Sequence, residues 1–329
     1  AVLGVLVSGT WAFRPAGLKL RMSTGRDIER SVVQLPGGFG METLRCRPVG
    51  SAVVSRDPPL VFLHGSFHAA WCWAEHWMPY FSAVGRDCYA VSLRGTQGSP
   101  LPEDGTSVSM DDHISDLGSW LEMQLPGQAP VLVAHSFGGI LAMKLLEEDP
   151  RRFSGAALFC SVPPSGNGPM TLRFLGSRPM ASVDIVRGFV AKQAATRPIL
   201  CRRLFFGSSL PEDSLLHRYM QCFQADSRVT LDLRALAPIL PSKSADDAGV
   251  ATFAHRLPPI LVAGAGEDFL VDREGVTETG RFLGVAPSKG LDSLRNGDAF
   301  IFLESLSHDV MLGSSWLVAA KELERWLLL

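Results

Sequence analysis

Short, continuous apolar runs recur along this chain, and segments with helical spacing separate them. The clearest runs are residues 60–63 (LVFL), 130–134 (PVLVA), 155–160 (GAALFC) and 259–264 (PILVAG). A strand with no polar alternation is buried on both faces, which is typical of a parallel sheet covered by helices. Because parallel neighbours need crossover connections, and these are right-handed, the alternation predicts a doubly wound, mostly parallel α/β sheet.

Other segments extend the same pattern. Residues 31–35 and 41–47 flank Gly37-Gly38 and predict an antiparallel hairpin ahead of the sheet. Ser109 is placed to cap the helix that follows it, because its side-chain oxygen can accept from a backbone N–H of the first turn. The remaining predicted strands are 88–93 and 299–304, and the predicted helices are 69–84, 110–124, 137–148 and 315–328.

The series of buried strands is interrupted once. Residues 163–255 begin at Pro163-Pro164, contain no buried-strand run and are mainly helical in composition. We therefore expect an α/β core formed by residues 30–162 and 256–329, with residues 163–255 inserted as a helical cap. The insertion is expected above the carboxyl ends of the strands, where open sheets bind ligands.

A basic segment precedes the first predicted strand, within a leader of residues 1–29. Residues 1–26 contain four basic residues and several Ser and Thr residues but no acidic residue. This composition resembles an organelle transit peptide and predicts a plastid location. The alternative is a disordered end on a cytoplasmic protein.

Composition and residue spacing exclude several classes of protein. A net charge of −2 leaves no basic surface for nucleic acid, and no apolar run reaches the ~18 residues of an integral membrane segment. None of the six cysteines belongs to a C-x-x-C pair, so buried free thiols are expected. His64 and His68 are four residues apart but lack a carboxylate partner between them, so no metal site is predicted. No dinucleotide-binding motif or P-loop occurs, so no cofactor is predicted.

The strongest chemical signal is the segment 131–139 (VLVAHSFGG), in which a buried strand leads through Ser136 into a helix. This is the nucleophile-elbow pattern G-x-S-x-G, with Ala134 in place of the first glycine. Small residues two before and two after the serine let the strand and helix approach each other. The N–H of Phe137, at the start of the helix, is placed to stabilise an oxyanion. The alternative is an ordinary serine in a strand–helix turn.

An acid and a base are expected after the serine, in that chain order. Asp268 lies just past the predicted strand 259–264 and is our candidate acid, with Glu267 and Asp272 as competitors. His308 follows the last predicted strand, on the loop before the final helix, and is our candidate base.

A second oxyanion donor is expected from the loop after the first buried strand, residues 64–68 (HGSFH). Gly65 lets the backbone approach a substrate, and the N–H of Ser66 is the candidate donor. His64 is interpreted as a support for this loop rather than as a reacting group. The tryptophans that follow, Trp71, Trp73 and Trp77, are interpreted as core residues rather than as a ligand-binding box.

These segments resemble the α/β-hydrolase superfamily over residues 58–325. Residues 64–73 (HGSFHAAWCW) are similar to the H-G-x-x-H-x-x-W-x-W stretch of the plant methylesterase and hydroxynitrile lyase group. Residues 93–99 (LRGTQGS) are similar to the L-R-G-x-G-x-S turn found widely in the superfamily, with one residue more between the glycines. The resemblance implies an eight-stranded sheet, a helical cap and a Ser-His-Asp triad. The chain departs from it at Ala134, in an extra loop expected at 288–298, and at Asp309, where lyases have Lys after the catalytic His.

The combined prediction is a serine hydrolase with the α/β-hydrolase fold. It would cleave a small apolar carboxylic ester, a small-molecule substrate, through Ser136, His308 and Asp268 and an acyl-enzyme intermediate. One alternative keeps the triad but changes the reaction to that of a lyase, thioesterase, amidase or lipase. Because a negative group at Asp309 would not stabilise departing cyanide, the lyase hypothesis is less favoured. Another alternative is a ligand-binding or scaffolding protein that retains the fold.

Overall fold

The computed structural model describes residues 19–21, 27–48, 57–101, 107–208, 212–227, 230–231, 239–287 and 297–329. Most of the predicted leader lies outside these ranges, and so do residues 288–296 of the predicted added loop.

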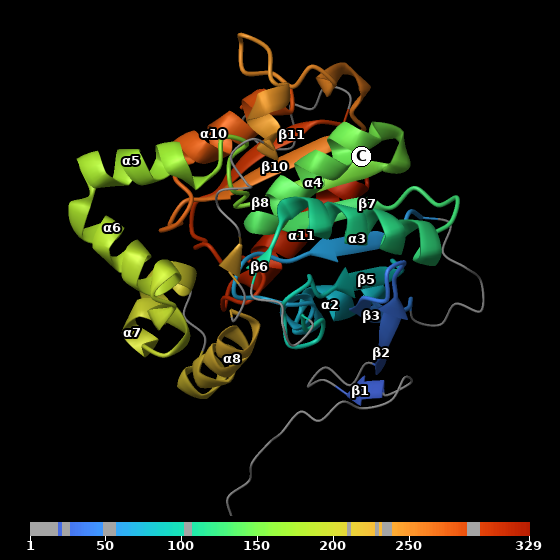
Figure 1. Ribbon diagram of the computed structural model, residues 1–329, viewed down its shortest axis with the longest axis horizontal. Coiled ribbons are helices and arrows are strands. Elements are labelled where there is room, and N and C mark those ends of the chain that lie inside the picture. Colours follow the sequence, from blue (N-terminus) through green and yellow to red (C-terminus); the bar gives the residue numbers. More distant parts are fainter. Residues whose placement is uncertain are drawn as a thin grey trace, which may run out of the picture.

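A single large sheet organises the described part of the chain (Figure 1). Its nine strands are, in spatial order, β1 (Lys19–Arg21), β2 (Asp27–Gln34), β3 (Gly40–Cys46), β5 (Cys88–Val91), β4 (Leu60–Leu63), β7 (Val131–His135), β8 (Gly155–Phe159), β10 (Ile260–Ala265) and β11 (Ala299–Leu303). The strands from β5 to β11 run parallel, whereas β1, β2 and β3 pair antiparallel. The predicted doubly wound, mostly parallel sheet is confirmed. The strand β1 is one more than the eight that the resemblance implied, and sequence analysis had placed it in the leader.

The helices of the core follow the predicted alternation, with two exceptions. They are α1 (Trp71–Ala74), α2 (Trp77–Ala83), α3 (Met110–Gln124), α4 (Phe137–Glu148), α10 (Arg273–Phe282) and α11 (Trp316–Leu327). The predicted helix 69–84 is divided into α1 and α2, because Pro79 cannot donate to the carbonyl of Glu75 and its ring opposes a continuous helix there. Helix α10 was not predicted, since its Gly275, Thr277, Thr279 and Gly280 are weak helix formers.

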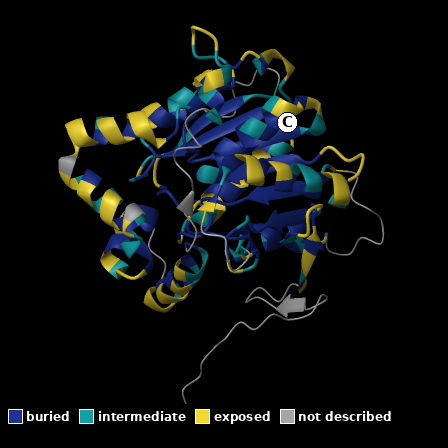
Figure 2. Cartoon of the chain, in the orientation of Figure 1, coloured by how far each residue is buried: buried dark blue, intermediate teal, exposed yellow. Residues whose placement is uncertain are grey.

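Successive residues of each central strand enter two different hydrophobic cores. Leu60 and Phe62 pack with residues of α1, α2 and α11, and the Phe62 ring lies 5.0 Å from that of Trp73. Val61 and Leu63 pack with residues of α3, α4 and α10 on the other face. Figure 2 shows the strands as buried throughout the centre of the molecule. The sheet is therefore covered on both faces, as continuous apolar runs require.

The segment between β8 and β10 is mainly helical where it is described. It contains α5 (Asn167–Ser177), α6 (Pro179–Ile185), α7 (Pro198–Cys201), α8 (Asp213–Asp226) and the π-helical turns Val186–Val190 and Arg202–Phe206, and its strand β9 (Thr230–Leu231) pairs with β6 (Ser107–Val108). Figure 1 shows α5 to α8 as a group at one side of the sheet.

Helix α8 contributes polar contacts that join this helical segment to the core. Arg218 of α8 donates to both carboxylate oxygens of Glu75, at 2.6 and 2.5 Å. Asp226, at the end of the same helix, accepts from the indole of Trp71 and from the backbone of Gln97, each at 2.9 Å. Helix α8 is thus held against the segment that follows β4.

The cysteine prediction is confirmed. None of the six cysteines forms a disulfide; five are buried and Cys222 is partly buried. Within the described residues, no helix has the length and apolar character needed to cross a lipid bilayer.

We predict that Gly138→Ala destabilises the protein. A Cβ at this position would lie 2.6 Å from the carbonyl oxygen of Leu63 and 2.8 Å from that of His64, so α4 would have to move away from β4. Overpacking of this kind costs about 1–3 kcal/mol of the free energy of unfolding, measurable by urea denaturation. Gly118→Ala is the matched control, because the space around Gly118 in α3 is open and the added methyl should stabilise by about 0.5–1 kcal/mol. Equal unfolding midpoints for the two variants would contradict this account.

Candidate active site

Ser136 sits in a strained turn between β7 and α4. Its φ of 53° and ψ of −119° place a non-glycine residue in a sparsely populated backbone region. Backbone hydrogen bonds hold this conformation: the Ser136 N–H donates to Phe159 at 3.1 Å, and its carbonyl accepts from Val162 at 3.1 Å and from Gly139 at 2.9 Å. The turn puts the serine at the amino end of α4, where the helix dipole favours negative charge.

The loop after β4 approaches this serine directly. A Cβ on Gly65 would lie 2.8 Å from the Ser136 Cβ and 3.1 Å from the His135 Nδ1, so only glycine fits there. The loop then turns through Ser66, which is exposed, and Phe67, which has a φ of 69°. The N–H of His68 donates to the Gly65 carbonyl at 3.4 Å and closes the turn. The candidate donor Ser66 is thus one residue from the contact with Ser136.

His64 supports this loop, as predicted. Its Nε2 accepts from the N–H of Leu93 at 2.9 Å, and its Nδ1 donates to the carbonyl of Gly65 at 2.8 Å. The backbone partners therefore define the tautomer. Burial lowers the pKa of His64 to about 3, so the ring stays neutral. Both ring nitrogens are occupied, which leaves neither free to act on a substrate.

Asp268 and His308 form a direct hydrogen-bonded pair. The His308 Nδ1 lies 3.0 and 2.9 Å from the two carboxylate oxygens of Asp268, and both side chains are buried. Asp268 also accepts from the N–H groups of Leu270 and Val271, at 2.7 and 2.9 Å, which fixes its orientation. Because Nδ1–H faces the carboxylate, Nε2 of the neutral ring is left as the proton acceptor.

The environment of His308 favours its protonated form. Burial by itself lowers the pKa of His308, but the charge and hydrogen bond of Asp268, with the charge of Asp309, outweigh it. The pKa therefore lies above its ordinary value of 6.5. A base of this kind accepts a proton readily and holds it until a leaving group needs it.

The competing acids have other partners. Glu267 accepts from the N–H of Ser208 at 3.2 Å and from the Ser208 hydroxyl. Asp272 caps α10 by accepting from Gly275 at 2.8 Å, and it forms a bidentate ion pair with Arg173. The structure thus brings Asp268, rather than either neighbour, against His308.

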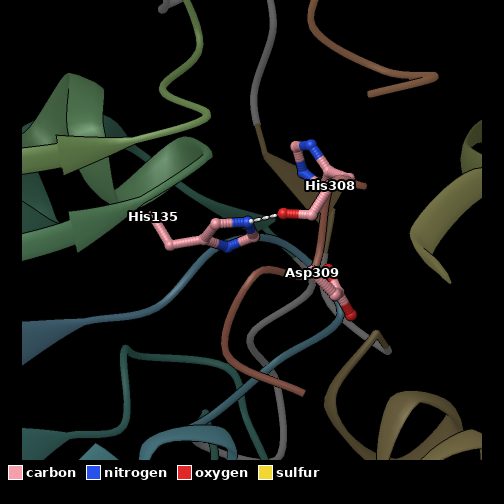
Figure 3. Close-up of side chains that lie close together, drawn as sticks. All are labelled: His135, His308 and Asp309. Carbon is pink, nitrogen blue, oxygen red and sulfur yellow. Dashed lines mark hydrogen bonds between the residues drawn. The ribbon is translucent and has the colours of Figure 1, made fainter. Parts of the chain in front are cut away.

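His135, the residue before the nucleophile, connects the serine turn to the histidine loop. Its Nε2 donates to the carbonyl oxygen of His308 at 2.9 Å, and the two rings have centroids 4.7 Å apart (Figure 3). This role was not predicted from the sequence, although His135 stands inside the nucleophile-elbow segment 131–139. Among the described residues, no hydrogen bond joins the Ser136 hydroxyl to His308. Such bonds are often long in a ligand-free site.

Within the part of the chain that the structure describes, two groups of side chains could offer three metal-ligating atoms each. The groups are His135, His308 and Asp309, and Cys160, Asp268 and His308. Both include His308, whose Nδ1 is already bound to Asp268. Burial, with the charge of Asp268, raises the pKa of the Cys160 thiol well above 9.0, so that group stays protonated rather than a thiolate ligand. We therefore assign no metal to either group.

A family model described as the alpha/beta hydrolase family matches residues 60–320. The chain therefore belongs to the α/β-hydrolase family. Methylesterase 1 of Arabidopsis thaliana is 33% identical over 110 residues, which are 33% of this chain and 41% of that protein. Methyl jasmonate esterase 1 of Vitis vinifera is 30% identical over 109 residues, 32% of this chain and 40% of that protein. The chain thus spans about two fifths of the length of these relatives.

Solved structures agree in fold. Epoxide hydrolase VrEH1 from Vigna radiata superposes with a TM-score of 0.62 at 18% identity, covering 91% of this chain and 97% of that one. At this identity the likeness supports the fold alone. The predicted resemblance to the α/β-hydrolase superfamily, with relatives among the plant methylesterases, is confirmed.

We predict that Asp268→Asn lowers kcat for an ester substrate by about 10⁴-fold, because an amide in this place favours the wrong imidazole tautomer. Glu267→Gln should leave kcat within a few-fold of wild type. Asp272→Ala is the control for loss of a partly buried, hydrogen-bonded acid: loss of the helix cap should cost about 1 kcal/mol of stability but little kcat. A severe loss of kcat in Asp272→Ala with a mild one in Asp268→Asn would overturn the assignment.

Proposed function

We propose that this protein is a serine hydrolase that cleaves small, apolar carboxylic esters. The observation that carries the proposal is the convergence of a strained serine at a helix amino end with a buried Asp268–His308 pair on neighbouring loops. Similarity to a methylesterase and a methyl jasmonate esterase supports an ester as the substrate.

The reaction would proceed in two halves. The Ser136 Oγ attacks the ester carbonyl while His308 Nε2 takes the hydroxyl proton. Asp268 stabilises the imidazolium that forms. The N–H groups of Ser66 and Phe137 stabilise the oxyanion, and His308 then protonates the departing alcohol. Water attacks the acyl-enzyme in the second half, with His308 again as base. All of these steps use groups of this chain, and none is routed through a cofactor.

An aromatic cluster beside the pair supports an apolar substrate. The centroid of the Phe205 ring lies 6.4 Å from that of His308 and 5.8 Å from that of Phe67. Phe67 belongs to the loop after β4, residues 64–68, which we call the oxyanion loop. Phe189, also from the helical segment, lies 4.9 Å from Phe67. These contacts favour residues 163–255 as a cap that selects the substrate without supplying the triad. Each methylene group buried against such a surface is worth about 0.8 kcal/mol.

The alternatives place different demands on the site. A cyanide-releasing lyase needs a cation beside the catalytic histidine, whereas Asp309 holds a carboxyl group there, paired with His68. A thioesterase, amidase or lipase would use the same three groups, and the size of the accepted acyl chain separates them. A ligand-binding protein would bind esters without turning them over.

We predict that Ser136→Ala lowers kcat by 10⁴-fold or more with the fold intact, since the attacking oxygen is lost. The measurement is turnover of p-nitrophenyl esters of graded acyl length, with circular dichroism as the check on folding. The same series reports the acyl length that wild type prefers. Wild-type turnover retained in Ser136→Ala would contradict the proposal, and binding without turnover in wild type would favour the ligand-binding alternative.

We predict that kcat/KM falls as the pH is lowered, with its midpoint above 6.5. The base must be neutral, and His308 becomes protonated as the pH falls through its raised pKa. Burial lowers the pKa of His64 to about 3 and that of His113 to about 4, so neither can produce this limb. A pH–rate profile that is flat from pH 5 to 8, with chemistry rate-limiting, would rule out His308 as the base.

A further inference from the structure

A second histidine–aspartate pair lies beside the proposed catalytic one. His68 Nε2 is 3.0 Å from Asp309 Oδ2, and the two side chains are 1% and 0% exposed. His68 belongs to the oxyanion loop, whereas Asp309 directly follows His308. We propose that His68 and Asp309 are positioning residues that hold the Ser66 N–H in place for the oxyanion, an inference that rests on the proposed function.

The hydrogen bonds of His68 define where its protons lie. Its Nδ1 is 2.7 Å from the carbonyl oxygen of Ser66, which can only accept, so Nδ1 carries a proton. One further proton must lie between Nε2 and Asp309 Oδ2, on either atom, because two lone pairs would repel. A continuous series of hydrogen bonds therefore runs from the Ser66 carbonyl through the His68 ring to the Asp309 carboxyl.

The oxyanion loop needs such a support because its backbone is strained. Phe67 has a φ of 69°, a left-handed value that a residue with a β-carbon rarely adopts, because its side chain crowds the backbone there. The closing backbone bond of this turn, from His68 to Gly65, is long at 3.4 Å. The hydrogen bond from the His68 ring to the Ser66 carbonyl is shorter and lies in the same turn. It would hold Ser66, whose N–H is the proposed oxyanion donor.

Asp309 is itself firmly placed. Its N–H donates to the carbonyl of Phe205 at 2.9 Å, and the preceding carbonyl, of His308, accepts from His135. Figure 3 shows Asp309 and His308 on one loop with His135 beside them. His68 is enclosed by aromatic rings, with the Phe223 centroid at 4.8 Å and the Trp71 centroid at 5.9 Å. The pair therefore joins two loops that are 241 residues apart in sequence.

The test compares kcat and KM for p-nitrophenyl acetate in four variants. Asp309→Asn keeps the hydrogen bond, because its amide can donate to the lone pair of Nε2, and should stay within about 3-fold of wild type. Asp309→Leu and the double variant His68→Phe/Asp309→Leu lose the bond and should show a kcat lower by about 10–100-fold, with KM changed less than 3-fold. The double variant removes both side chains of the pair, so neither is left buried without its partner, and it should fold even if Asp309→Leu does not.

Thr43→Val is the matched control. It removes the buried hydrogen bond, 2.8 Å long, from the Trp120 indole to the hydroxyl of Thr43, which lies on β3, separated from β4 by β5, and should reduce stability without lowering kcat. A trifluoromethyl ketone, which forms a tetrahedral oxyanion on a serine, supplies a second readout. Its affinity should fall in the double variant by the same factor as kcat/KM.

Two results would overturn the inference. One is a folded double variant with wild-type kcat and wild-type affinity for the ketone. The other is an Asp309→Asn variant as slow as the double variant, which would assign the effect to charge rather than to the hydrogen bond. Failure of the proposed function looks different: wild type and Ser136→Ala would then turn over the ester equally.

Discussion

Parallel strands end at the same edge of a sheet, and the candidate site depends on that constraint. The loop after β4 is the proposed oxyanion loop. The segments that follow β7, β10 and β11 carry Ser136, Asp268 and His308. A loop whose strand ran the opposite way would lie at the other edge of the sheet and could not reach the remaining loops. Burial of the strands on both faces enforces their parallel order, because the two hydrophobic cores require helical crossovers on each side. The apolar runs thus determine where the polar groups meet.

Hydrogen bonds then set the geometry within that edge. Asp268 orients His308 from one side, and His135 holds the His308 backbone from another. The His68–Asp309 contact joins the oxyanion loop to the same histidine loop. Each of these groups is buried, where an unpaired polar atom costs about 1–3 kcal/mol, so the arrangement is resistant to small displacements. Preorganisation of this kind is what oxyanion stabilisation requires.

Sequence patterns predicted the elements with strong periodicity. Helices α3 and α4 begin and end where predicted, because Ser109 caps the first and Ser136 starts the second. Helix α10 was not predicted because its glycine and threonine residues weaken the helical signal. The break between α1 and α2 was not predicted because the apolar residues on both sides of Pro79 gave one continuous helical pattern. Local patterns, in short, were reliable where local propensity agreed with the tertiary structure.

The candidate site was predicted as separate residues rather than as a network. Strand ends and chain order led to Ser136, Asp268 and His308, and the structure places the last two in contact. Asp309 was read only as a departure from a lyase pattern, since nothing local reveals that it meets His68 across 241 residues. Long-range pairing of this kind depends on how the loops converge, which no single stretch of sequence contains.

The most direct test of the central claim is covalent labelling with a fluorophosphonate, followed by peptide mass mapping. The reagent reacts with a serine only where a neighbouring base and an oxyanion site activate it. The account predicts a single phosphonylated peptide in the folded wild-type protein, modified at Ser136, and no such adduct after heat denaturation. An unlabelled wild-type protein, or a label on another serine that persists in Ser136→Ala, would contradict it.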